Sequence, residues 1–200
     1  MGYDIFADQL LLHTVQPAAV LDALLGTGVH VPDKSLVHPF NAVPYAWMQG
    51  QMAARLTTEG EGAVWFWAQI GRRDLVDFCR QAKGEVLFTC KVPREQVLLS
   101  HFGDWHAVLN RRPHVPDLPG ESDAEYRARF EQVLDDFEER LRTVGGWGAE
   151  ITDWPADLRS EVEQGWQPVL EPAHYGRFES WQATTHVLRA ENVVEAVRFV

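Results

Sequence analysis

The clearest hydrophobic pattern in this chain lies in its second half, over residues 122–144. Apolar side chains recur there at the spacing of one helix face, and they are Tyr126, Phe130, Val133 or Leu134, Phe137, Leu141 and Val144. Acids and arginines fill the other positions, and Ser122 with Glu125 forms a capping box. The pattern predicts an amphipathic helix that stops at the glycines of "VGGWG".

Shorter apolar runs predict strands and further helices. The runs that favour strands are "QLLLHTVQ", "GAVWFWAQI", "EVLFTCKV", "VLLS", "SWQATTHVL" and "VVEAVRFV". Because the second of these alternates poorly, we expect it to be a strand buried on both faces. Helical spacing appears in "AAVLDALLGTG", which Gly26 or Gly28 ends, and in "YAWMQGQMAARL", which Pro44 opens. It appears again in "RDLVDFCRQAKG", "FGDWHAVLN" and "PADLRSEVEQG".

These elements predict an α+β fold in one compact domain over residues 1–200, with a central mixed or antiparallel sheet flanked by helices. The proline-rich loop near residues 111–121 is the best candidate for a domain boundary. We expect the helix after this loop to pack back on the same core. The last two strand runs flank the turn-like "RAEN", so we expect them to form a pair.

Composition narrows the class of protein. The chain has 200 residues, of which 46% are apolar and 24% charged, as in ordinary globular proteins. Its formal charge of -11 argues against non-specific nucleic-acid binding, which needs a basic surface. Cys79 and Cys90 lie in apolar sequence, which indicates buried thiols in a reducing compartment. No secretory signal and no apolar run of membrane-spanning length is visible, so we expect a soluble cytoplasmic protein.

Several classes of enzyme lack their defining motif in this sequence. The chain has no G-x-S-x-G turn for a serine hydrolase and no glycine-rich loop that would cradle a phosphate. His13, His106 and His186 show no metal-ligand spacing, so we expect no metal site. A histidine in a strand is more often a satisfied core or rim residue than a catalyst.

The eight tryptophans allow two interpretations. Trp65 and Trp67 share one face of the aromatic strand, while Trp47 and Trp105 lie in short helical segments. Most of them are typical of an aromatic core whose indole N–H groups find backbone partners. One or two are also suited to a cleft that stacks a flat ligand, such as a nucleobase or nicotinamide.

Several stretches together resemble an uncharacterised bacterial family, domain of unknown function three-eight-four-one. They are "HTVQ", "LLGTGV", "YAWMQGQM", "VWFWAQ", "VPREQVLLSHFGDWHAVLN", "GWQPVLE" and "WQATTHVLRAENVVEAVRF". They follow one another from about residue 11 to residue 199 and so cover nearly the whole chain. This resemblance implies no activity, because no established function comes with the family.

A more distant resemblance concerns the layout of the elements, which is similar to that of ADP-ribosyltransferase-type domains. It implies that NAD is the substrate, and that His13 and Thr14 on the first strand contact it. It implies further that Trp65 or Trp67, with Tyr45, lines the cofactor cleft. A glutamate at the start of a late strand would complete such a site, and the stretch "RFESWQATT" offers Glu179 and Gln182 there.

Gln182 occupies the more natural of these two places. An amide there departs from the glutamate that the resemblance implies, and this difference leaves two functions open. An amide neither stabilises a developing oxocarbenium charge as a carboxylate does nor acts as a general base. Glu179 should point to the opposite face, about 10 Å along the strand, unless a bulge or turn at "RFES" redirects it. One function is an NAD-using transferase or glycohydrolase in which Glu179, Gln182 and His13 are catalytic. The alternative is a non-catalytic module that binds a nucleotide-like ligand or a protein partner in the same cleft.

Overall fold

A computed structural model of the chain describes residues 4–175 and 179–199. The strands are β1 (Gln9–Pro17), β2 (Val29–His30), β3 (Val64–Gln69), β4 (Glu85–Pro93), β5 (Leu98–His101), β6 (Trp181–Thr185), β7 (Leu188–Arg189) and β8 (Val193–Arg198). The α-helices are α1 (Ala18–Thr27), α2 (Ala42–Arg55), α3 (Arg72–Arg80), α4 (Trp105–Leu109), α5 (Asp123–Thr143) and α6 (Ala156–Gly165). Short 3₁₀ turns connect several of them, among them η3 (Arg94–Gln96) and η5 (Gln167–Leu170).

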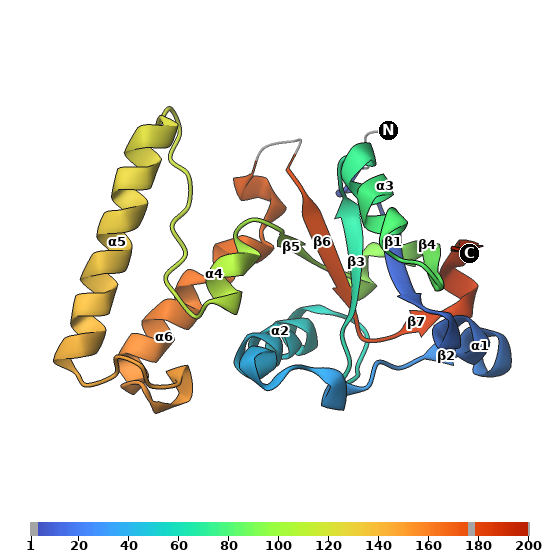
Figure 1. Cartoon of the computed structure of the whole chain (residues 1–200), viewed down its shortest axis with the longest axis horizontal. Coiled ribbons are helices and arrows are strands. Elements are labelled where there is room, and N and C mark those ends of the chain that lie inside the picture. Colours follow the sequence, from blue (N-terminus) through green and yellow to red (C-terminus); the bar gives the residue numbers. More distant parts are fainter. Residues whose placement is uncertain (1–3, 176–178, 200) are drawn as a thin grey trace.

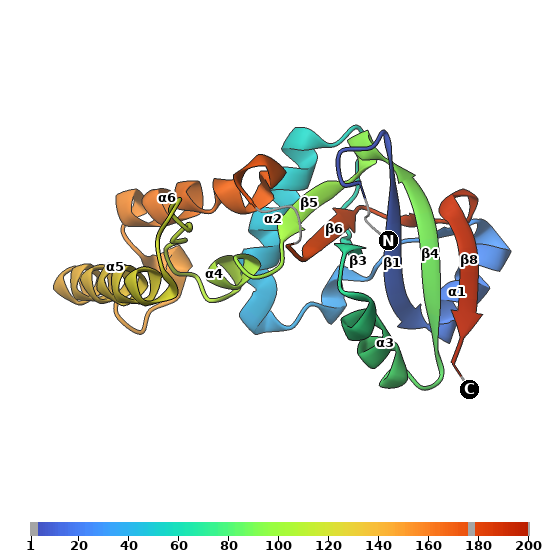
Figure 2. The ribbon, with the colours of Figure 1, turned by 90° about the horizontal axis from the view of Figure 1, so that it is seen from above.

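The centre of the molecule is a six-stranded sheet with the order β5–β6–β3–β1–β4–β8, in which every paired neighbour is antiparallel. β2 and β7 form a separate small ladder beside α1 (Figure 1). The helices α5 and α6 extend away from the sheet on one side, and α4 lies between them and the sheet (Figures 1 and 2). This arrangement confirms the predicted α+β fold with an antiparallel sheet and flanking helices.

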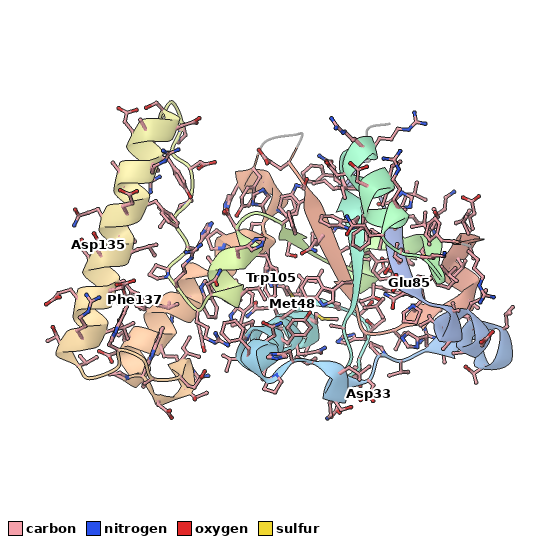
Figure 3. The ribbon with its side chains drawn as sticks, in the orientation of Figure 1. Asp33, Met48, Glu85, Trp105, Asp135 and Phe137 are labelled. Atoms are coloured by element: carbon pink, nitrogen blue, oxygen red, sulfur yellow. The ribbon has the colours of Figure 1, made fainter. Side chains whose placement is uncertain are left out.

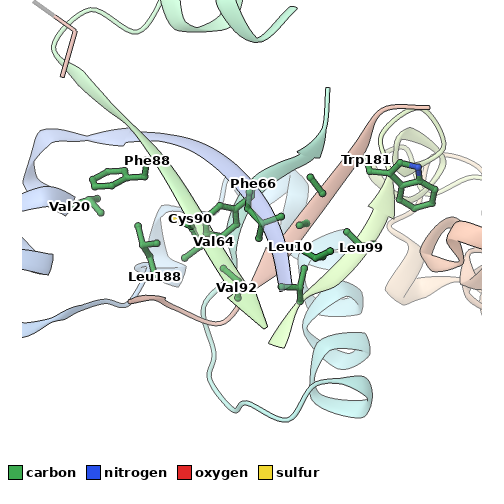
Figure 4. Packing of buried hydrophobic residues seen from close by; sticks show 14 of the residues in the cluster. Leu10, Val20, Val64, Phe66, Phe88, Cys90, Val92, Leu99, Trp181 and Leu188 are labelled. Carbon is green, nitrogen blue, oxygen red and sulfur yellow. The ribbon is translucent and has the colours of Figure 1, made fainter. Parts of the chain in front are cut away.

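Each face of the sheet packs on its own hydrophobic cluster. One face carries the residues of what we call the first core, which α1 covers through Val20 and Leu24 (Figure 4). The largest of its sheet residues are Leu12, Phe66, Phe88, Leu99 and Trp181. The burial of so much apolar surface drives the formation of the sheet, at about 25 cal/mol per Å² removed from water.

The opposite face meets the second core, which α2, α4, α5 and α6 supply. Met48 of α2 and Trp105 of α4 lie between the sheet and the helices (Figure 3). Thr184 of β6 joins this contact, because its Oγ1 lies 3.8 Å from the Met48 sulfur. Phe137 of α5 belongs to the same cluster, so the helix after the proline-rich loop packs on the sheet-bound core, as the sequence predicts.

Local signals in the sequence fix several element ends. At the start of α5 the Ser122 hydroxyl accepts a hydrogen bond from the Glu125 backbone N–H. The Glu125 carboxylate accepts one from the Ser122 backbone N–H, which confirms the predicted capping box. Gly28 ends α1 with a φ of 77°, a left-handed conformation that glycine adopts without strain. α2 begins at Ala42 rather than at Pro44, because proline is tolerated throughout the first turn, where its missing N–H has no partner.

Two further expectations need correction. β3 is buried on one face only: Val64, Phe66 and Ala68 are buried, while the tryptophans between them stay partly exposed. A large indole is seldom covered completely, and α2 and α4 shield only part of this face. Of the two free cysteines, Cys90 is buried, and burial raises the pKa of its thiol to about 12, but Cys79 is only half-buried.

The last two strand runs do not pair with each other. β6 lies between β5 and β3, whereas β8 forms the opposite edge beside β4. The predicted "SWQATTHVL" strand is interrupted at His186, and Leu188 and Arg189 pair with β2 in the small ladder instead. Neighbours along the chain therefore separate in the sheet, with three strands between β6 and β8.

Candidate functional site

One row of side chains crosses all six strands on the face of the second core. Residues directly opposite each other in an antiparallel pair project from the same face, so the register defines the row. It consists, in strand order, of Ser100, Gln182, Trp67, His13, Thr89 and Glu195. We call it the cross-strand row. It brings together His13, Trp67 and Gln182, which come from distant parts of the chain and which the sequence suggests as site residues.

Two polar atoms of this row are buried without a partner. Ser100 is 0% exposed, and its Oγ has no hydrogen bond within the described part of the chain. Gln182 is partly exposed, yet its Oε1 is buried and also lacks a partner among those residues. A buried polar group that forms no hydrogen bond costs about 1–3 kcal/mol. Such a cost, incurred twice at neighbouring positions, calls for an explanation, which in native proteins is commonly an ordered water molecule or a ligand.

Aromatic rings border these two residues. The rings of Trp67 and Phe102 meet edge to face with centroids 4.9 Å apart, and Phe102 meets His106 in the same way at 5.3 Å. Phe102 follows β5 directly and is 36% exposed, so this part of the aromatic surface is open to solvent. Its position arises because the chain leaves β5 and turns into α4 within a few residues.

A second aromatic group continues from Trp65, two positions from Trp67 on the same face of β3. Trp65 lies 5.6 Å from Tyr45 of α2 and 5.2 Å from Trp105 of α4, measured between ring centroids. Burial raises the pKa of Tyr45. Tyr45 and Trp65, both predicted to line the cleft, therefore lie in one aromatic group, and Trp67 lies in the other group on the same face of β3.

His13 is a buried, uncharged member of the cross-strand row. It is 8% exposed, and its Nδ1 lies 3.1 Å from Thr89 Oγ1. Burial lowers the pKa of His13, and the charge of Glu195 at the end of the row opposes this shift only in part. The imidazole is therefore neutral at pH 7 and serves as a hydrogen-bonding group rather than as a cation.

Thr14 and Glu179 lie away from this surface. Thr14 faces the first core, where its Oγ1 accepts a hydrogen bond from Gln16 Nε2 at 2.8 Å. Glu179 Oε2 lies 3.5 Å from Nε2 of His101, which is opposite Trp181 and so projects from the face that Gln182 does not use. The acid thus points away from the row, as strand periodicity predicts. The first two residues of "RFES", the stretch in which a bulge or turn would redirect Glu179, lie outside the described residues.

Beside Glu179 the structure contains a polar network that sequence reasoning missed. Asp104 Oδ2 accepts hydrogen bonds from His114 Nε2 and from the Tyr175 hydroxyl, each at 2.8 Å. The Asp104 backbone N–H donates to His101 Nδ1 at 3.3 Å, and the His101 ring stacks on Tyr175. Burial alone would raise the pKa of Asp104, but its contacts with His101, His114 and Tyr175 lower that pKa well below its ordinary value.

Ser100 and Phe102 were also missed as site residues. They occur in the stretch "LLSHF", which the sequence marks only as a short strand and the start of a helix. The signal that could have found them is non-local: β5 pairs with β6, which places Ser100 beside Gln182. Strand order of this kind is not encoded in the spacing of apolar residues.

Within residues 4–175 and 179–199, no group of three or more histidine, cysteine, aspartate or glutamate side chains is placed to hold a metal ion. None of the helices in the described ranges has both the length and the apolar character required to cross a membrane.

Comparison with known proteins identifies a family. The model of the family described as Domain of unknown function (DUF3841) matches residues 11–194, which is most of the chain. The chain therefore belongs to this family. No curated protein and no solved structure matches it. The family description names no activity.

Proposed function

We propose that this member of the DUF3841 family binds a flat, nucleotide-type ligand on the cross-strand row, and that NAD is the first such ligand to test. The observation that carries the proposal is the pair of buried, unpartnered atoms, Ser100 Oγ and Gln182 Oε1, next to an aromatic surface. Ligand sites in proteins combine apolar or aromatic walls with a few convergent polar groups in this way.

The chemistry of the two polar groups defines what the ligand must offer. A glutamine Oε1 only accepts hydrogen bonds, whereas a serine hydroxyl both donates and accepts. A ligand that presents an N–H group beside a carbonyl or ring nitrogen would satisfy both, as the carboxamide of nicotinamide or the amino edge of adenine does. The exposed edge of Phe102 and the neighbouring Trp67 supply apolar area for the ring of that ligand.

Neutral groups dominate this row, which favours binding over charge-stabilising catalysis. The pKa of His13 is lowered by burial, and Gln182 is a neutral amide where the layout of ADP-ribosyltransferase-type domains implies a carboxylate that stabilises a developing cation. The acids nearest in sequence and register are Glu179, whose carboxylate faces His101 on the other side, and Glu195, at the far edge of the row.

Isothermal titration calorimetry with NAD, ADP-ribose and nicotinamide tests this function. We expect the wild-type protein to bind at least one of them, and Gln182→Ala to weaken that binding by about tenfold or more, since one lost hydrogen bond to a buried partner costs about 1–3 kcal/mol. Trp147→Leu serves as the control, because Trp147 is exposed at the end of α5, away from the row. The proposal fails if none of the three ligands binds, or if Gln182→Ala binds as tightly as the wild type.

Cleavage of NAD is a second candidate function. It is supported by the position of β1, β3 and β6 as direct neighbours, since these strands carry the three elements that the layout of ADP-ribosyltransferase-type domains implies. Chromatographic assay of free nicotinamide would detect this activity. Release of nicotinamide that Glu179→Gln or Glu195→Gln abolishes would establish it, and an NAD pool unchanged after prolonged incubation would rule it out.

A further inference from the structure

A separate cavity lies between α4, the proline-rich loop and α5. Its volume is about 220 Å³, and its wall includes Asp104, Arg112, His114, Tyr126 and Phe130. The last two belong to α5, one turn apart, so the projecting helix forms the outer wall of this cavity. Pockets for drug-sized ligands usually measure about 300–1,000 Å³, so this one fits a more compact molecule.

The one carboxylate in this wall is already saturated with donors. Asp104 Oδ2 accepts from both His114 and Tyr175, which also holds these side chains in place. The side chain of His114 is almost completely buried beside it. The acid is therefore a fixed part of the wall, with its Oδ2 already engaged by donors of the protein.

Arg112 also lines this cavity. Within the described ranges it forms no ion pair, whereas arginines nearby on α5 do, Arg129 with Glu121 and Arg140 with Glu161. Its Nε is buried and lacks a hydrogen bond there, and its guanidinium lies 5.2 Å from the Phe130 ring centroid. A buried or half-buried cation without a counter-ion is unfavourable.

The position of Arg112 is fixed by its backbone. Its N–H donates to the Ala107 carbonyl at 3.0 Å, and its own carbonyl accepts from the Trp166 indole at 2.8 Å. Trp166 is fully buried in the second core. The guanidinium is thus presented at the cavity from a rigid support, a feature typical of binding sites rather than of mobile surface arginines.

We propose that this cavity binds a small organic anion, whose carboxylate or phosphate group pairs with Arg112 while an apolar portion packs on Phe130 and Val115. The guanidinium matches the geometry of both anions, because its N–H groups form a planar fork. This site is distinct from the cross-strand row, and the inference does not depend on the function proposed for that row.

Ligand-observed NMR and calorimetry with benzoate, benzamide and inorganic phosphate test the proposal. Benzoate and benzamide have the same shape, but only benzoate carries a charge. We expect benzoate or phosphate to bind, and Arg112→Gln to weaken that binding by about tenfold or more. Arg127→Gln is the matched control, because Arg127 is exposed on α5 and its loss changes the net charge equally.

Three results would overturn the proposal. They are the absence of benzoate and phosphate binding up to about 10 mM, equal affinity for benzamide and benzoate, and equal weakening in both arginine variants. If Arg112→Gln does not fold, the wild-type protein still gives the answer. Phenylglyoxal should then modify Arg112 several-fold more slowly with saturating benzoate present, as followed by peptide mass spectrometry, and an unchanged rate contradicts the site.

Discussion

Ser100 and Gln182 lie directly opposite each other on β5 and β6, and both present a buried oxygen without a hydrogen-bond partner in the described residues. Folding has thus placed two unsatisfied groups side by side next to exposed aromatic area. Native proteins rarely retain such groups without a reason, which is commonly a ligand or an ordered water molecule.

Replacement of Ser100 by alanine tests whether its hydroxyl forms a hydrogen bond in the unliganded protein. Removing an unsatisfied buried hydroxyl should leave the free energy of unfolding unchanged or raise it by up to about 1 kcal/mol. The affinity for the ligand that calorimetry identifies should fall at least several-fold. Chemical denaturation and titration of the same preparation measure both effects.

Ser160→Ala is the control for this experiment, since Ser160 is exposed on α6 and lies outside the row. It should change neither quantity appreciably. A loss of more than about 1.5 kcal/mol in Ser100→Ala without ligand would mean that the hydroxyl does have a partner in the protein.

The buried state of His13 predicts a pH dependence of stability. Because burial lowers the pKa of His13 in the folded state, the unfolded chain takes up the proton more readily. The stabilising contribution is therefore complete above about pH 6.5 and is lost as the pH falls through the lower, folded-state pKa. His13→Gln should flatten this decline between pH 7 and pH 5 by at most about 1.4 kcal/mol per pH unit.

Denaturation series at several pH values measure this slope. His186 has its pKa lowered by burial as well, with Glu59 opposing the shift, so a residual slope should remain in His13→Gln. Exposed His174 provides the comparison, and His174→Gln should keep the slope of the wild type. A His13→Gln protein with the same slope would show that His13 is protonated without cost.

Asp104 should make the protein resistant to mild acid. Burial favours the neutral acid, but the contacts with His101, His114 and Tyr175 prevail and lower the pKa of Asp104. Its contribution is present above the unfolded pKa of about 4 and is lost as the pH falls further, through the folded-state value. Asp104→Asn should lower the free energy of unfolding at pH 7 by about 1–3 kcal/mol, measured by urea denaturation.

The matched substitution is Asp135→Asn, on the solvent-facing side of α5 (Figure 3). It should alter the free energy of unfolding by no more than about 0.5 kcal/mol. If the two aspartate variants were equally stable, the network around Asp104 would contribute nothing to the fold.

Gly62 is required for packing between the loop before β3 and the end of β6. A Cβ at this position would lie 2.5 Å from Pro32 Cγ and 3.0 Å from the His186 carbonyl oxygen. Gly62→Ala should therefore destabilise the protein by about 1–3 kcal/mol. Gly50→Ala, inside α2 with open space around the added carbon, should instead stabilise it by about 0.5–1 kcal/mol. Thermal unfolding measures the stability of both variants. A Gly62→Ala protein as stable as the wild type would contradict the close contact of Gly62 with Pro32 and His186.

The parts of the fold that local chemistry determines were predictable from the sequence. The capping box of Ser122 and Glu125 and the left-handed Gly28 each involve groups a few residues apart, so their signals survive in any short window. The same holds for the alternation of side chains along a strand. It predicts Trp65 and Trp67 on one face, and Glu179 and Gln182 on opposite faces.

Relationships between distant segments were not predictable in this way. Ser100 meets Gln182 only because β5 docks beside β6, and Asp104 meets Tyr175 only because the chain returns after α6. β6 and β8 were expected to pair as neighbours in sequence, yet burial of the first core separates them. Strand order depends on the total packing of the sheet, which apolar spacing does not specify.

The most direct test of the proposed ligand surface is a two-dimensional ¹H–¹⁵N NMR spectrum of the tryptophan indole N–H groups, recorded as NAD is added. If NAD binds there, we expect the signals of Trp65 and Trp67 to shift progressively and saturate, while that of exposed Trp147 stays in place. Assignment by single tryptophan substitutions identifies each signal. Unchanged Trp65 and Trp67 signals with NAD, ADP-ribose and nicotinamide at millimolar concentration would contradict binding of these ligands on the cross-strand row.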